Sequence, residues 1–207
     1  MKILQVYRTY YPEAEGGVLK VIRQLAIGLN NQGHTVRVFA PSRFGPETYV
    51  LDGVNVVTSK LDFEVASCGF TFSGLAEFQE QLKWADLVHY HFPWPFADVL
   101  HFLSDVKIPS IVTYHADIVK QRSLLLFYAP VMRRFFDRVD CIVATSSQYA
   151  NSSDYLSAQT EKTRVISLGI DEDSYPQTKT STLEQARQQF GEDYFLFVGV
   201  LRYYKGL

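Results

Sequence analysis

Cysteine is scarce in this sequence, and the two that occur, Cys68 and Cys141, lie far apart in the chain. Two distant cysteines neither form the disulfide framework of a small secreted domain nor supply a zinc site. Cys141 stands in an apolar segment, where a buried free thiol is the ordinary outcome. The sequence therefore excludes a disulfide-stabilised scaffold and a structural zinc module.

A surplus of one charge and a long apolar run are both absent. The 20 Lys and Arg residues nearly balance 22 Asp and Glu residues, giving a formal net charge of -2, so charge offers no argument for nucleic acid as a partner. No stretch reaches the ~18 apolar residues of a membrane-spanning helix. Residues 1–7 have a strand pattern and Arg8 follows, unlike a signal peptide. We therefore expect a cytoplasmic protein that binds no nucleic acid.

The composition is that of a globular protein with a substantial core. Hydrophobic residues make up 47% of the chain and aromatic residues 14%, which excludes general disorder. A chain of 207 residues is long for one domain and short for two full ones. Length alone thus leaves the number of domains open.

A strand–helix–strand unit occupies the first forty residues. Residues 3–7 and 35–40 have the apolar pattern of short strands. Between them, apolar side chains recur from Val18 to Leu29 at the spacing of one buried helix face. Gly33 follows and suits the left-handed position that ends a helix.

Two adjacent glycines, Gly16 and Gly17, stand at the turn from the first strand into this helix. Glycine lets the backbone approach a ligand closely, and a helix N-terminus offers unpaired N–H groups that suit a phosphate. The alternative is that the pair only makes a tight loop. No third glycine follows at the spacing of the dinucleotide-binding fingerprint.

Strand and helix patterns then alternate along the chain. Strands are expected at residues 54–57, 87–91, 111–114, 141–145 and 164–166, and helical stripes at 75–84 and 96–103. Strands separated by segments of helical length indicate a parallel sheet covered on both faces. The predicted fold class is therefore α/β, a doubly wound parallel sheet of the Rossmann-like kind.

Several polar features follow expected strands and should meet at the carboxyl edge of that sheet, where such folds bind ligands. They are the Gly16–Gly17 loop, His89 and His91, and the His115–Ala116–Asp117 segment. His89 and His91 alternate on one strand and therefore share a face. Two histidines could begin a metal site, but no third ligand lies near in sequence, so a packing or acceptor-pocket role is favoured.

The last forty residues change in character. Residues 169–176 form an acidic turn that ends in proline, a plausible domain boundary, and residues 182–190 have a short helical pattern. Residues 194–200 are strongly β-forming and apolar. We expect this strand to begin a second domain that the chain has only just entered.

With these parts placed, the sequence resembles the large family of retaining glycosyltransferases often called family 4, which have two facing Rossmann-like domains (the GT-B fold). The resemblance extends over essentially the whole chain. It rests on YYPEAEGGVLKVIRQLAIGLNNQGHTVRVFA, ADLVHYHFPWP, IPSIVTYHADIVKQ, VDCIVATSSQYA, VISLGIDEDSYP and FVGVLRYYKG, in this order.

The resemblance implies an acceptor-binding domain at residues 1–168, a linker with a connecting helix at 169–193, and the first strand of a donor-binding domain at 194–207. It implies transfer of a hexose, mannose or rhamnose being favoured, from a nucleotide diphosphate sugar to a saccharide or lipid-linked acceptor in cell-surface polysaccharide, lipopolysaccharide or glycolipid synthesis. The anomeric configuration would be retained and no cofactor used. Without the second domain, the fragment is expected to be inactive.

The resemblance also assigns residues. They are His115 as the catalytic residue, Gly16, Gly17, Arg202 and Lys205 for the donor phosphates and sugar, Tyr10, Tyr11, His91, Asp117 and Lys120 for the acceptor, and no metal ligand. An imidazole at His115 can hydrogen-bond a sugar hydroxyl; read alone, it would be a structural histidine. The family's usual glycine–arginine pair is replaced by Gly199–Val200, which puts the diphosphate contacts in question.

Residues 121–139 combine apolar side chains with four arginines. Such a helix would suit an anionic bilayer, giving peripheral contact with the inner face of the plasma membrane. The alternative is an ordinary helix that packs on the sheet with its arginines in solvent. Pro130 is expected to kink or divide it.

Two other function classes remain in view. A sugar-nucleotide or dinucleotide oxidoreductase is disfavoured because the three-glycine fingerprint and a Tyr-x-x-x-Lys pair in the right place are missing. A non-catalytic nucleotide- or carbohydrate-binding module is the main alternative to a transferase. Sugar turnover with the second domain restored would separate these two readings.

Overall fold

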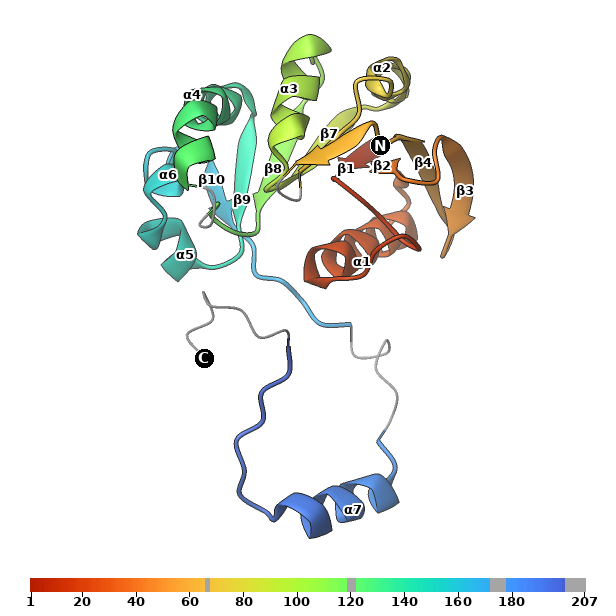
Figure 1. Ribbon diagram of the computed structural model, residues 1–207, viewed down its shortest axis with the longest axis vertical. Helices are drawn as coiled ribbons and strands as arrows, with labels where there is room; N and C mark the ends of the chain where they lie inside the picture. Colours follow the sequence, from red (N-terminus) through yellow and green to blue (C-terminus); the bar gives the residue numbers. More distant parts are fainter. Residues whose placement is uncertain (66–67, 119–121, 172–177, 200–207) are drawn as a thin grey trace. The chain divides into compact units, whose positions relative to one another are not determined.

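The computed structural model describes residues 1–65, 68–118, 122–171 and 178–199 (Figure 1). The chain divides into two compact units, Met1–Gly169 and Ile170–Leu207. Three predicted site residues, Lys120, Arg202 and Lys205, lie outside the described residues.

The first unit is built on an eight-stranded sheet with the order β10-β9-β8-β7-β1-β2-β4-β3. Neighbouring strands pair in parallel except β3, which runs antiparallel to β4 at one edge. The predicted doubly wound α/β class is confirmed. The strands are β1 (Lys2–Val6), β2 (Thr35–Ser42), β3 (Glu47–Leu51), β4 (Val54–Lys60), β7 (Leu87–Phe92), β8 (Ser110–Tyr114), β9 (Cys141–Ala144) and β10 (Thr163–Val165).

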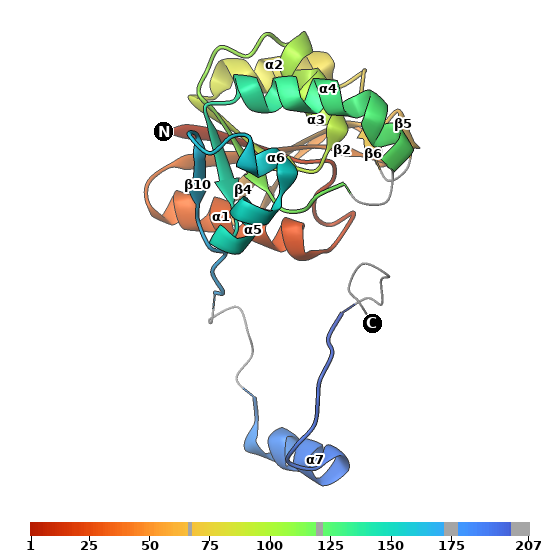
Figure 2. The same cartoon turned by 90° about the vertical axis from the view of Figure 1, so that its left-hand side faces the viewer.

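Helices cover both faces of this sheet. One face carries α1, and the other carries α2, α3 and α4, as the two views show (Figures 1 and 2). The helices of the first unit are α1 (Gly17–Asn31), α2 (Leu75–Trp84), α3 (Pro95–Leu103), α4 (Arg122–Arg138), α5 (Ser147–Ser152) and α6 (Asp154–Ser157). The second unit contains α7 (Thr180–Phe190), close to the helix predicted at 182–190.

Helix α1 buries a face slightly rotated from the predicted one. Leu19, Ile22 and Ala26 are buried, whereas Leu25, expected on the buried face, is 37% exposed. The helix ends as predicted, because Gly33 adopts a φ of 86°, which suits a residue without a Cβ.

Three short strands were not predicted. The edge strand β3 is only partly buried, so its pattern resembles a turn-rich surface segment. The strands β5 (Phe63–Val65) and β6 (Cys68–Phe70) form a separate antiparallel pair of three residues each. Such short elements are set by their partners rather than by apolar periodicity.

The prediction of a strand at residues 194–200 is wrong for residues 194–199, the part that the structure describes. Residues 194–199 have no strand assignment, and Phe195 and Val198 are fully or largely exposed. A β-forming sequence makes a strand only when a neighbouring strand pairs with its backbone. The described residues of this unit provide no such partner.

The order of the strands reverses at β1. From β1 the chain passes to β2 on one side, and the later strands β7, β8, β9 and β10 follow on the other side. In open α/β sheets, ligands bind outside the carboxyl ends of the strands at such a switch point. The segments that follow β1, β7 and β8 are therefore where a site is expected.

Candidate functional site

Five polar side chains lie on one face of the sheet near the carboxyl ends of β1, β7 and β8. Gln5 is opposite His89 in the register of β1 and β7, and His91 is opposite Thr113 in that of β7 and β8. Alternate residues of a strand share a face, so His115, two residues after Thr113, continues the same set. We call Gln5, His89, His91, Thr113 and His115 the polar row.

Hydrogen bonds connect the members of the polar row. The Nε2 of His91 lies 3.0 Å from the Oε1 of Gln5, and its Nδ1 lies 3.0 Å from the Nε2 of His115. The Nε2 of His89 lies 2.7 Å from the Thr113 hydroxyl. The imidazoles of His89 and His91 also stack, with centroids 4.5 Å apart, whereas those of His91 and His115 are nearly coplanar, with centroids 5.3 Å apart.

These histidines are held neutral. Burial, with a smaller contribution from His115, lowers the pKa of His89 to about 4. Burial likewise lowers the pKa of His115 to about 4 and that of His91 well below the usual value, His89 and His115 adding to the effect on His91. A second positive charge beside the first would be unfavourable in this setting. Near neutral pH the row therefore contains uncharged imidazoles.

His115 is the member of the row that a ligand can reach. It is half-buried, whereas His91 is 1% exposed. Its backbone N–H donates to the carbonyl of Phe92 at 3.0 Å, which fixes it at the end of β8. Within the described parts of the chain, its Nδ1 has no hydrogen-bond partner. One imidazole nitrogen is thus left for a ligand.

The glycine turn lies at the same edge, after β1. Gly16 caps α1 and Gly17 begins it, with no acidic residue in the first turn. A Cβ built on either glycine would meet none of the described atoms within 4 Å. The backbone is therefore uncrowded where a 15-residue helix begins, and the unpaired N–H groups of a helix N-terminus suit an anionic group.

A pocket of about 210 Å³ opens beside the loop between β1 and α1. We call it the Arg43 pocket. Its lining includes Arg8, Thr9, Glu13, Arg43, Leu61 and Glu64.

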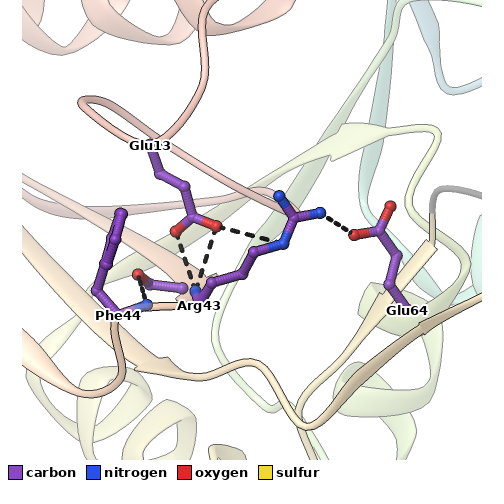
Figure 3. Close-up of polar contacts among 5 residues, drawn as sticks. Glu13, Arg43, Phe44 and Glu64 are labelled. Carbon is purple, nitrogen blue, oxygen red and sulfur yellow. Dashed lines mark hydrogen bonds and ion pairs between the residues drawn. The ribbon is translucent and has the colours of Figure 1, made fainter.

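Arg43 joins two walls of this pocket (Figure 3). The carboxylate of Glu13 accepts from the backbone N–H of Arg43 at 3.2 and 3.1 Å and lies 4.0 Å from its Nε. The Nη2 of Arg43 donates to Glu64 at 2.6 Å. The Glu13 side chain is 12% exposed, and that of Arg43 is 65% exposed. A guanidinium held between two carboxylates therefore faces the opening.

The other predicted site residues of the described chain lie mostly in packed positions. Tyr10 is 3% exposed and His91 is 1% exposed, so a direct acceptor contact by either side chain would require movement. Tyr11 is half-buried, packs edge-on against Tyr10 at 5.4 Å and accepts at its carbonyl from Tyr49. Asp117 accepts from the Tyr114 hydroxyl at 2.6 Å and the Ser153 hydroxyl at 3.0 Å. Of this acceptor set, Tyr11 and Asp117 remain partly accessible.

Sequence reasoning missed Gln5 and the charged residues of the Arg43 pocket. Gln5 was read only as part of a strand, although a polar residue at a buried strand position is an unusual feature that would have identified it. Glu13 and Arg43 belong to segments 30 residues apart. No local pattern links them, because the parallel pairing of β1 with β2 brings them together.

Helix α4 packs on the core through part of its apolar set. Met132, Phe135 and Phe136 are buried, and Arg133 and Arg134 are exposed, as the packing alternative predicts. The helix runs through Pro130 as one element, so of the two expected effects of this residue, a kink or a division, the division does not occur.

The described residues lack two other features. None of their helices has the length and apolarity to cross a membrane. They also contain no group of three or more His, Cys, Asp or Glu side chains placed to hold a metal ion.

Solved structures share this fold. The chain superposes on Anabaena Alr3699/HepE in complex with UDP-glucose with a TM-score of 0.64 and 18% identity, covering 92% of this chain and 50% of that one. It matches sucrose-phosphate synthase from Thermosynechococcus elongatus with a TM-score of 0.62 and 16% identity, covering 93% and 53%. At these identities the likeness shows the fold, that of GT-B glycosyltransferases.

Sequence comparison gives the family. Residues 15–174 match Glycosyltransferase Family 4, and the chain belongs to this family. It is 47% identical to D-rhamnosyltransferase WbpZ of Pseudomonas aeruginosa and 40% identical to O-antigen chain mannosyltransferase C of Escherichia coli, over 100% of this chain. It spans 55% and 56% of these proteins, about half the length of each.

Proposed function

We propose that this chain is the acceptor-binding half of a retaining glycosyltransferase, with residues 170–207 leading into a donor-binding half. The enzyme transfers a hexose, of the rhamnose or mannose type, from a nucleoside diphosphate sugar to a saccharide or lipid-linked acceptor. The names of the two relatives support the sugar and the polysaccharide context. The observation that carries the proposal is His115, which offers Nδ1 at the carboxyl edge of β8, two strands from the glycine turn after β1.

On the donor side, we assign the diphosphate to the N-terminus of α1 and the sugar to His115. The backbone at Gly16 and Gly17 is open, and the helix dipole favours negative charge there. His115 hydrogen-bonds a hydroxyl of the donor sugar. Arg202 and Lys205, which lie outside the described residues, remain assigned to the leaving diphosphate, where positive charge would lower the barrier.

On the acceptor side, the Arg43 pocket supplies a binding surface beside this edge. Arg8 and Arg43 balance Glu13 and Glu64, so the lining favours a neutral ligand. Sugar hydroxyls both donate and accept hydrogen bonds and can pair with guanidinium and carboxylate groups alike. A volume of about 210 Å³ is below the ~300 Å³ at which drug-sized pockets begin. One monosaccharide unit of the acceptor fits these conditions.

The remaining acceptor residues are Tyr11, Asp117 and Lys120. Tyr11 and Asp117 are accessible in part, and Lys120 lies outside the described residues. Tyr10 and His91 support neighbouring groups in this arrangement. Tyr10 packs on Tyr11, and His91 holds His115.

The test of the reaction uses the complete protein to which this chain belongs. A panel of nucleoside diphosphate hexoses is offered with saccharide and lipid-linked acceptors, and nucleoside diphosphate release is followed. The anomeric configuration of the product is determined by NMR. We expect release with one donor and a product with the donor's configuration. An inverted product would overturn retention alone.

A carbohydrate- or nucleotide-binding module without turnover is the alternative. It predicts binding of a nucleotide sugar or saccharide with no release from any donor in the panel. This outcome would contradict the transferase proposal as a whole.

A further inference from the structure

We propose that Gln5 and His91 fix the tautomer of His115, so that its Nε2 carries the proton and its Nδ1 accepts a hydrogen bond from the ligand. Gln5 and His91 are then positioning residues that act through His115. The inference rests on the proposed function only for the identity of the ligand, a sugar hydroxyl.

The chain of hydrogen bonds begins at Gln5. Its side chain is 0% exposed, and its Oε1 lies 3.0 Å from the Nε2 of His91. An amide oxygen can only accept a hydrogen bond. The proton of this bond therefore belongs to the Nε2 of His91.

The donor and acceptor roles at His91 then decide those at His115. A neutral imidazole carries one N–H and one acceptor nitrogen. Because His91 is neutral and its Nε2 holds the proton, its Nδ1 accepts from the Nε2 of His115 across 3.0 Å. His115 is neutral as well, so its own Nδ1 has a free lone pair.

The surroundings hold both rings in this geometry. His91 stacks on His89 and lies edge to edge with His115, and Tyr7 meets it edge-on at 6.3 Å. Arg8 in turn covers Tyr7, with its guanidinium carbon 5.8 Å from the centre of the Tyr7 ring. Ring rotation would break two hydrogen bonds in a buried setting, where a polar group without a partner is unfavourable.

The orientation of the Gln5 amide decides which nitrogen of His115 carries the proton. In this orientation its Nε2 has no hydrogen-bond partner among the described residues. A reversed amide would donate to the Nε2 of His91, which would move a proton to each Nδ1 and make His115 a donor. The two states differ chemically. An acceptor at Nδ1 selects a hydroxyl group, whereas a donor there would also bind a phosphate oxygen.

The tautomer can be measured without any activity assay. The complete protein is prepared with 15N-labelled imidazoles, and long-range 1H–15N correlations are recorded near pH 7. We expect His91 and His115 both to show the proton on Nε2 and an unprotonated Nδ1. A proton on the Nδ1 of His115 would overturn the inference, and so would an equal mixture of tautomers.

A variant tests the role of Gln5 itself. Gln5→Met keeps the volume and removes the amide, and we expect His115 to become a mixture of tautomers. The matched control is Thr113→Val, which removes the partner of His89 on the same face and should leave His115 unchanged. An unchanged tautomer in a folded Gln5→Met protein would contradict the inference. If this variant does not fold, the wild-type spectrum decides.

Turnover gives a second readout that depends on the proposed function. Gln5→Met should raise the donor KM by about tenfold, the size of one lost hydrogen bond, while the acceptor KM stays the same. Failure to find any transferase activity would remove the ligand assignment and leave the tautomer result standing. A tautomer opposite to the expected one would remove the inference and leave the transferase proposal standing.

Discussion

His91 and His115 lie edge to edge in nearly the same plane, with the Nδ1 of one 3.0 Å from the Nε2 of the other and an interplanar angle of 19°. His115 reaches the carboxyl edge of the sheet, whereas His91 is buried behind it. The orientation of the His115 ring therefore depends on a buried neighbour. The predicted acceptor contact of His91 would require movement of this buried side chain.

Replacement of His91 tests this dependence. His91→Phe keeps the aromatic ring that stacks on His89 and removes both hydrogen bonds, so His115 loses its fixed orientation. We expect kcat/KM for transfer to fall by about tenfold to a hundredfold, the range of one or two lost hydrogen bonds. The measurement is nucleoside diphosphate release by the complete protein. His101→Phe, a buried histidine that pairs with Tyr90, is the control. Equal rates for His91→Phe and wild type would contradict the positioning role.

Acid should destabilise this fold through its buried histidines. The pKa values of His89, His101 and His115 lie at about 4, below the usual ~6.5 of an unfolded chain. The unfolded state therefore binds more protons between these values. Stability is complete above pH ~6.5 and falls as the pH drops toward 4, by up to about 1.4 kcal/mol per pH unit for each such histidine.

Denaturant unfolding between pH 4 and 8 checks this dependence. A midpoint that stays constant from pH 6.5 to 4.5 would count against neutral buried imidazoles. The slope should also decrease in a His89→Phe variant, because one of the titrating groups is then absent.

The Arg43 pocket predicts a separate effect on the acceptor. Glu13→Gln keeps the shape of the side chain and removes the charge that pairs with Arg43. We expect the acceptor KM to rise by about fivefold to tenfold, with the donor KM unchanged, because the pocket is assigned to the acceptor alone. Glu80→Gln, which breaks an exposed pair with Lys83, is the control. A change in the donor KM instead would contradict this assignment and place the Arg43 pocket in the donor site.

The glycine turn predicts weaker donor binding without loss of stability. No described atom lies within 4 Å of a Cβ at Gly16 or Gly17, so Gly17→Ala should fold with an unchanged melting temperature. The added methyl group would stand where the diphosphate approaches, and we expect donor affinity to fall by about tenfold or more. Gly28→Ala, which also has open space around it within α1, is the control. Unchanged donor affinity in Gly17→Ala would show that the donor diphosphate does not bind at this turn.

The parts of the fold that were predictable have strong local patterns. The first strand–helix–strand unit, and strands such as those at 87–91 and 111–114, follow from apolar periodicity and from the glycine that ends α1. The edge strand β3 and the β5–β6 pair have weak patterns and are set by their neighbours. Residues 194–199 show the opposite case, a strong β pattern without a described partner strand.

The site was predictable only in part, for a similar reason. His115 and the alternating His89 and His91 could be found along the chain, because each follows or lies on an apolar strand. Their hydrogen bonds could not, because the register of β1, β7 and β8 decides that His91 meets both Gln5 and His115. The Glu13–Arg43 pair has the same origin in the pairing of distant segments.

The most direct test of the account compares sugar transfer by the complete protein with and without His115. Wild type and His115→Ala are assayed with the donor that the panel selects, and with His34→Ala, whose histidine lies away from the row beside Met1, as the control. The account predicts a loss of at least about a hundredfold for His115→Ala, the size typical of a group that meets the reacting sugar, and near wild-type rates for the control. Full activity in a folded His115→Ala protein would contradict it.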